Sequence, residues 1–301
     1  MPPVSPEPTL IFDRDLLLRR RDRHAEAAPA HDFLLARVGE DFAERLSLIK
    51  RRFPLAANIG AHHGLISRSI GGVAGIERVI DVDRSLRLLR RCNGLRVLAD
   101  EEALPFADAS LDLVVSGLAL HLVNDLPGVL VQIKRALKPD GLLLAALLGG
   151  ETLRELRQSW LAAEAELTGG ASPRVAPFAD VRDLGALLQR AGFALPVVDS
   201  EVVTVTYASP LALMQEIRAM GASNMLLARR RRPVTRRLVM RAAEIYAERF
   251  GIAGGRVRAT FEILTLTAWA PDESQQRPLR PGSAQARLAD ALGLPERKLR
   301  E

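Results

Sequence analysis

Hydrophobic positions in the first part of the chain recur at helical spacing. Residues 14–50 are predicted to form two helices, and one of them carries an apolar face made by Phe33, Leu34, Val38, Phe42, Leu46 and Ile49. Pro54 ends this helical region. We therefore expect N-terminal helices over 11–54, preceded by a disordered segment over 1–10.

Between residues 55 and 148, short apolar runs alternate with helical segments. The runs that predict strands are 55–59, 78–82, 95–99, 111–116 and 142–148, and their almost continuous apolar character predicts burial on both faces. Helices are predicted between most of these strands, at 85–91 and 127–137 for example. This alternation is typical of a parallel sheet built from right-handed crossovers.

The rhythm changes after Gly149 and Gly150. Helices are predicted at 151–167, 181–191, 210–220 and 234–250, and alternating strands at 201–207 and 256–269. The sequence thus predicts an α/β fold with a seven-stranded, mostly parallel sheet. A helical insertion at about 208–252 precedes the last strand. We expect the main domain to cover 55–270 and a polar C-terminal tail to cover 271–301.

Composition limits the class of protein. A chain of 301 residues that is 48% hydrophobic can bury a sizeable core without disulfides or a structural metal. Its one cysteine, Cys92, cannot form an internal disulfide, which fits a reducing compartment. The longest apolar run, 142–148, is far shorter than the ~20 residues that span a bilayer. We therefore expect a cytoplasmic protein, with peripheral attachment at the inner face of the membrane as the alternative.

Positive charge is concentrated in two arginine clusters, at 19–21 and 229–232, in a chain with a net charge of +6. One interpretation is a surface that binds nucleic acid or another anion. The other is a set of solvated helix faces. Since no aromatic residues interleave the arginines to stack bases, we favour solvated faces and expect no nucleic-acid partner.

Candidate ligand-binding residues follow the carboxyl ends of the predicted strands, where open α/β sheets bind ligands. The loop at 58–64 contains Gly60 and Gly64, which let the backbone approach a ligand closely. Asp83 can accept both hydroxyls of a ribose, and Asp100 can accept from an adenine amino group. Either acid alone fits a helix N-cap. Their positions at successive strand ends favour nucleoside binding.

These motifs resemble those of the class I S-adenosylmethionine (SAM) methyltransferases, on the runs 100–106, 111–114 and 138–141. Over residues 10–285 the chain also resembles a family of respiratory complex I assembly factors with a methyltransferase fold that hydroxylate an arginine of a complex I subunit. This resemblance rests on the segments 11–14, 98–102, 120–127, 149–157, 183–193, 220–224 and 273–284. A more distant resemblance is to the malonyl-acyl-carrier-protein methyltransferase of biotin synthesis.

The resemblance implies a Rossmann-like fold, SAM as cofactor and a protein substrate, in particular a complex I subunit. The implied reaction is side-chain methylation or arginine hydroxylation, and the alternative is carboxyl O-methyl transfer to an acyl-carrier protein. The expected cofactor-binding residues are Asn58, Gly60, His62, Gly64, Asp83, Asp100, Glu101 and Ser116. His121 is expected near the substrate, either as a general base or as a structural histidine.

The glycine loop departs from the family pattern at two positions. Asn58 stands where the family has an acid, and His62 replaces the glycine that lets the methionine end of SAM lie against the backbone. Because an imidazole would crowd that end, a non-catalytic assembly chaperone is an alternative function. A further interpretation makes His62, His63 and Asp83 ligands of a non-haem iron. It is the weaker one, since adjacent side chains on a turn rarely converge on one ion.

Overall fold

The structure is a computed structural model that describes residues 10–276. Within the described residues, 10–271 form one compact unit that contains all the helices and strands. Most of the predicted disordered start and most of the predicted polar tail lie outside the described residues.

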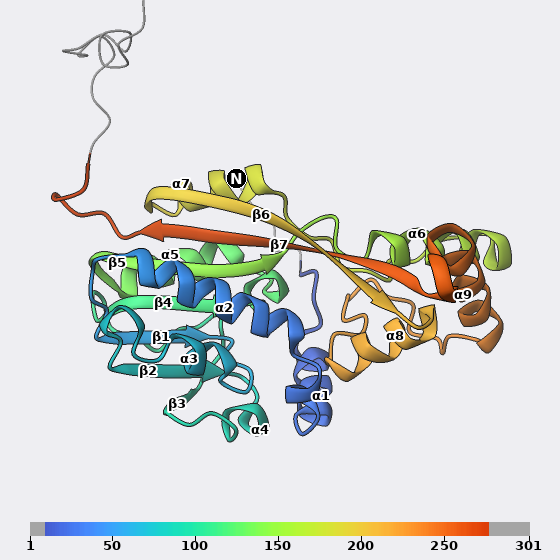
Figure 1. Cartoon of the computed structure of the whole chain (residues 1–301), viewed down its shortest axis with the longest axis horizontal. Helices are drawn as coiled ribbons and strands as arrows, with labels where there is room; N and C mark the ends of the chain where they lie inside the picture. The colour runs from blue at the N-terminus through green and yellow to red at the C-terminus, as the bar shows by residue number, and fades with distance from the viewer. Residues whose placement is uncertain (1–9, 277–301) are drawn as a thin grey trace, which may run out of the picture. The chain divides into compact units, whose positions relative to one another are not determined.

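A seven-stranded sheet in the order β3-β2-β1-β4-β5-β7-β6 forms the centre of this unit (Figure 1). Its strands are β1 (Leu55–Ile59), β2 (Arg78–Asp83), β3 (Leu95–Leu98), β4 (Leu111–Gly117), β5 (Leu137–Leu148), β6 (Ala194–Tyr207) and β7 (Val257–Trp269). Strands β1 to β5 are parallel, whereas β7 runs antiparallel to both β5 and β6. The predicted α/β class and the mostly parallel sheet are confirmed.

Two apolar layers cover the faces of the sheet, because side chains alternate along each strand. Leu113 and Val115 of β4 face helices α2 (Phe33–Leu48) and α3 (Leu65–Ile70) in one core. Val114 faces α5 (Leu126–Ala136) and α7 (Val181–Arg190) in the other. Strands β1 and β4 are almost continuously apolar because both of their faces are buried. The predicted burial is wrong for β3, where Leu95 and Leu98 are exposed because this strand lies at the edge of the sheet.

The helical insertion between β6 and β7 consists of α8 (Pro210–Ala219) and α9 (Arg236–Phe250). Helix α6 (Arg154–Thr168) joins it, since Ala163 of α6 packs on Leu238, Ala242 and Ile245 of α9. Strands β6 and β7 extend beyond the parallel strands towards these helices (Figure 1). Within residues 10–276, no helix combines the length and the apolar character that crossing a bilayer requires.

Asp13 is the N-cap of helix α1 (Arg14–His24), and its side chain accepts from the Leu16 N–H. It lies near the short α4 (Leu86–Leu89), which follows β2. Helix α1 is thereby placed at the carboxyl ends of the parallel strands, where the sequence predicts the ligand site.

Candidate functional site

The two acids predicted to bind a nucleoside lie at the ends of neighbouring parallel strands. Asp83 is the last residue of β2 and pairs in register with Leu98 of β3, two residues before Asp100. Asp83 is fully buried, and its two carboxylate oxygens accept hydrogen bonds from the backbone N–H groups of His62 (2.9 Å) and Ser85 (2.8 Å). Burial raises the pKa of this carboxyl group. Each oxygen keeps a lone pair for a further donor.

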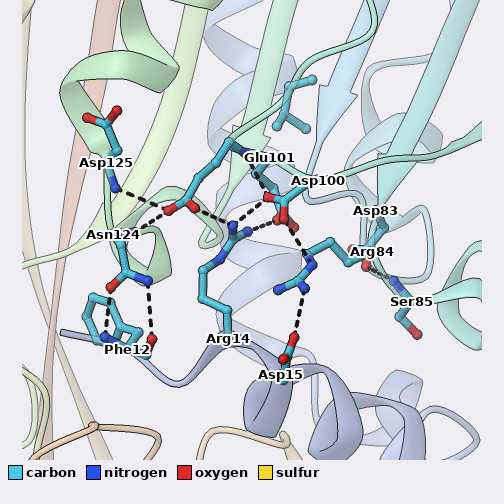
Figure 2. Close-up of polar contacts among 12 residues, drawn as sticks. Phe12, Arg14, Asp15, Asp83, Arg84, Ser85, Asp100, Glu101, Asn124 and Asp125 are labelled. Atoms are coloured by element: carbon cyan, nitrogen blue, oxygen red, sulfur yellow. Dashed lines mark hydrogen bonds and ion pairs between the residues drawn. The ribbon is translucent and has the colours of Figure 1, made fainter. Parts of the chain in front are cut away.

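The loop after β3 presents three consecutive acids to one arginine of α1. Figure 2 shows Arg14 reaching Asp100 (2.5 Å) and Glu101, and its guanidinium also pairs with Glu102 (2.8 Å). Burial opposes ionisation of Asp100, but the N–H of Glu102 and the guanidinium of Arg14 outweigh it and lower its pKa. The deeper Glu101 behaves differently, because burial and the nearby Asp83 carboxylate raise its pKa.

The crevice between these acids is filled by side chains of α1. Arg14, Leu17, Leu18 and Arg21 line it together with Asp83, Arg84 and Glu101, and its free volume is about 10 Å³. That volume holds at most about one water molecule. The acids that are expected to accept from a nucleoside are therefore close together, whereas the space between them is occupied by the chain itself.

In the loop after β1, Gly60 has a backbone conformation and a close contact that favour glycine. This residue has a φ of +68°, and a Cβ added there would lie 2.2 Å from the Cβ of Ala119. His62 has a φ of +56°, a left-handed conformation that few residues other than glycine adopt. The backbone thus keeps the shape of a glycine turn, and only the imidazole is added to it.

His62 and His121 face one cavity of about 120 Å³ next to the crevice, and Arg21 and Gly60 line it too. Burial lowers the pKa of His62 well below its usual range, and Arg21 and His63 lower it further. Burial, followed by Arg21, also lowers the pKa of His121 to about 3. The Nδ1 atoms of both histidines lack a hydrogen-bond partner among the described residues. Both imidazoles are therefore neutral groups that a ligand in this cavity would meet.

A second cavity, of about 260 Å³, lies on the other side of His121. Its apolar wall consists mainly of Trp160, Phe178, Met214, Met220, Met225 and Phe261. The ring of His121 packs edge-on against Phe178, with centroids 5.7 Å apart. At its border the guanidinium of Arg174 lies 4.5 Å from the centroid of the Trp160 ring and pairs with the buried Glu164. The residues that line both cavities are Leu34, His121, Leu122, Leu148, Met220 and Ala222.

Three of the predicted cofactor residues make their contacts within the protein. The Asn58 amide donates to Ser67 and to Asp81, each at 3.0 Å, and the Ser116 hydroxyl donates to the carbonyl of Ile59 (2.7 Å). Gly64 has a φ of +77° and packs close to Cys92. These residues hold the loop after β1 in place, so a direct contact with a cofactor stays a prediction.

Two arginines of the site were assigned to a solvated face by sequence reasoning, and that assignment is wrong. Arg21 is half-buried at both the crevice and the first cavity, and Arg20 donates to the carbonyls of Ser223 (2.6 Å) and Asn224 (2.7 Å). Only Arg19 of that cluster is exposed. The helical spacing of Leu17 and Arg21 carries a signal that would have placed both on the inner face of α1.

The iron-site interpretation finds no support in the geometry. Among residues 10–276, no group of three histidine, cysteine or acidic side chains is arranged to hold a metal ion. The rings of His62 and His63 are 5.1 Å apart, and the Nε2 of His63 lies 3.2 Å from Asp32 instead of near Asp83.

Comparison with known proteins gives matches over most of the chain. The profile of a methyltransferase domain matches residues 57–145. The arginine-hydroxylase NDUFAF5 of Danio rerio is 39% identical over 287 residues, which cover 93% of this chain and 89% of the relative. The human protein of the same name is 40% identical, with coverage of 93% and 83%.

Further matches lie at lower similarity. The malonyl-[acyl-carrier protein] O-methyltransferase of Gallionella capsiferriformans is 32% identical and covers 87% of this chain, with 92% of the relative covered. Among solved structures, a candidate methyltransferase from Bacillus halodurans has a TM-score of 0.54 at 16% identity, covering 77% of this chain and 98% of that one. The structural likeness concerns the fold alone.

Proposed function

The chain belongs to the SAM-dependent methyltransferase-fold family that includes the arginine hydroxylase NDUFAF5, and on this premise we propose that it modifies an arginine side chain of a protein. The resemblance to complex I assembly factors makes a complex I subunit the proposed partner. The observation that carries the proposal is the pair of adjoining cavities that share His121, one next to the nucleoside acids and one apolar.

We assign the nucleoside half of SAM to Asp83, Asp100 and Glu101, whose carboxylates accept from hydroxyl and amino groups. Gly60 allows the ligand to approach the backbone, and His62 meets its methionine end. When bound, SAM supplies an electrophilic methyl group. Of the other predicted residues, Asn58, Gly64 and Ser116 act by fixing the loop around Gly60.

The second cavity is the proposed acceptor site. Its aromatic and methionine side chains suit the methylene stem of a long side chain, since such walls adapt to flexible apolar groups. His121 stands between the two cavities as a neutral imidazole whose free Nδ1 can orient the acceptor by accepting a hydrogen bond, whereas its pKa of about 3 disfavours the general-base role. Closure around this site would exclude water from the reacting groups.

A carboxyl O-methyltransferase acting on an acyl-carrier protein is the second candidate. The apolar wall of the second cavity favours it, because an acyl chain requires the same kind of surface. Relatives of that name match this chain at lower identity than the arginine hydroxylases do.

Mass spectrometry of complex I subunits distinguishes these functions. We compare cells that contain the wild-type protein, the His121→Gln variant or no protein. A gain of one oxygen on an arginine that requires the wild-type protein supports hydroxylation, and a gain of one methylene supports methylation. Unchanged subunits together with intact complex I assembly in the His121→Gln cells would identify a non-catalytic chaperone.

A further inference from the structure

The acids that a nucleoside requires are already bound by an arginine from outside the sheet. The Arg14 side chain is 9% exposed and reaches all three carboxylates of residues 100–102 (Figure 2). Oδ1 of Asp100 also accepts from the N–H of Glu102 (2.8 Å), and Oδ2 lies 3.3 Å from Nε of Arg84. An adenine amino group that approaches Asp100 therefore has to compete with these two arginines.

The segment 11–24 is held at this place by polar contacts besides the ion pairs of Arg14, among them an ion pair between Asp13 and Arg229 (2.9 Å). The Asn124 side chain accepts from the N–H groups of Ile11 (2.9 Å) and Phe12 (2.8 Å). The Ser85 hydroxyl donates to Asp22 of α1 (2.5 Å). Such hydrogen bonds contribute little net free energy, because water replaces them when the segment leaves.

The apolar contacts of this segment are also separate from the two main cores. Phe12 and Leu17 pack with Leu122, Met225 and Leu226 in a small cluster of their own. Movement of α1 would therefore leave the packing of the sheet intact, because the cores on its two faces contain other residues.

We propose that the segment 11–24 is a latch that closes the nucleoside crevice through Arg14 and must withdraw before the cofactor binds. The inference rests on the proposed function, since it concerns the regulation of the same site. It explains why the crevice has nucleoside-type acceptors but a free volume of about 10 Å³. A partner protein that draws α1 away would switch the site on.

The test is calorimetric titration with 5′-methylthioadenosine, which carries the nucleoside half of SAM without its amino-acid end. Arg14→Gln should bind this ligand about tenfold more tightly than the wild-type protein, because the competing ion pairs are gone. Arg23→Gln is the matched control, since Arg23 is an exposed arginine on the same helix. Its affinity should equal that of the wild-type protein.

A second variant guards against a folding defect, since Arg14→Gln leaves the buried Glu101 without its cation. Asn124→Ala removes the side-chain hydrogen bonds to residues 11 and 12 and leaves Arg14, the acids and the backbone bonds to Met225 and Leu227 unchanged. It should also bind the nucleoside more tightly. Thermal melting of each variant identifies any loss of fold, and Asn124→Ala decides the question if Arg14→Gln does not fold.

Three results would overturn the latch. Weaker binding to Arg14→Gln would make Arg14 part of the binding site, and unchanged affinity in both variants would show that the latch does not limit binding. Both results leave the proposed cofactor site standing, because the nucleoside still binds. If no variant bound either 5′-methylthioadenosine or S-adenosylhomocysteine, both the proposed latch and the proposed cofactor site would be contradicted.

Discussion

At the residue scale, Arg21 places a positive charge between the crevice and the first cavity. It makes no hydrogen bond or ion pair within the described part of the chain, although it is half-buried at the junction of crevice and cavity. Burial is the main cause that lowers the pKa of His121 to about 3, and the charge of Arg21 is the second cause. A half-buried guanidinium of this kind suits a carboxylate ligand.

Substitution of Arg21 should therefore change the affinity for two ligands to different extents. We expect Arg21→Gln to weaken S-adenosylhomocysteine about tenfold more than 5′-methylthioadenosine, because only the first ligand has a carboxylate. Calorimetry with both ligands measures the difference. An equal loss for the two would show that Arg21 supports the fold of the site and does not meet the carboxylate.

His121 should make stability depend on pH in a defined window. Its pKa is lowered from 6.5 to about 3 in the folded protein, so below pH 6.5 the unfolded chain binds the proton more readily. Stability from this group is present above pH 6.5 and falls by about 1.4 kcal/mol for each pH unit towards pH 3. Asp83 and Glu101 have raised pKa values and act in the opposite direction.

Urea unfolding of wild-type protein and His121→Leu at several pH values isolates this effect. The difference in unfolding free energy between the two should shrink as the pH falls from 6.5 to 5, since the acids contribute equally to both. A difference that stays constant with pH would mean that the His121 imidazole reaches solvent and keeps an ordinary pKa.

The chemistry of single residues was only partly predictable. Asp83 and Asp100 were placed at neighbouring strand ends because the strand pattern fixes where each loop begins. The ion pair between Asp100 and Arg14 could not be predicted, since Arg14 comes from another segment and no local sequence pattern indicates such a contact. The same holds for Trp160, Phe178 and Phe261, which are far apart in the sequence and meet around the second cavity.

At the scale of elements, the turn after β1 depends on two separate properties of glycine. Gly60 has a positive φ and no space for a Cβ, whereas Gly72 has a φ of +80° with nothing within 4 Å of an added Cβ. Substitutions at Gly60 and Gly72 therefore distinguish the free-energy cost of a strained backbone from that of a steric clash.

Alanine substitutions should show the two costs. Gly72→Ala is expected to lower the unfolding free energy by about 1 kcal/mol from backbone strain alone. Gly60→Ala should lower it by about 3 kcal/mol, because the clash with Ala119 is added. Chemical denaturation of both variants measures this, and equal costs would mean that the turn after β1 relaxes without resistance.

Most elements followed from hydrophobic periodicity, and the exceptions have local causes. Strand β6 begins at Ala194, earlier than the alternating run at 201–207 predicts, because its first part pairs with the end of β7 through a register shift. Strand β5 begins at Leu137, earlier than the apolar run at 142–148 predicts, since Leu137 pairs with Leu111 before another register shift. Bulges of this type leave no periodic signal.

At the scale of the whole molecule, the site is assembled from three parts of the chain. The parallel strands supply Asp83 and the acids of the next loop, α1 supplies Arg14 and Arg21, and α8 with its neighbouring loop supplies Met214 and Met220. The sheet could be predicted because strands and crossovers follow strict rules. The docking of α1 could not, because it rests on side-chain contacts between distant segments.

The central claim is that the carboxyl ends of β2 and β3 form a nucleoside site. The direct test is titration of Arg14→Gln and of Arg14→Gln with Asp83→Asn using S-adenosylhomocysteine. We expect the first variant to bind and the added Asp83→Asn change to weaken binding at least about tenfold, since the carboxylate that accepts the ribose hydroxyls loses its charge. Equal affinity of the two variants would contradict the claim.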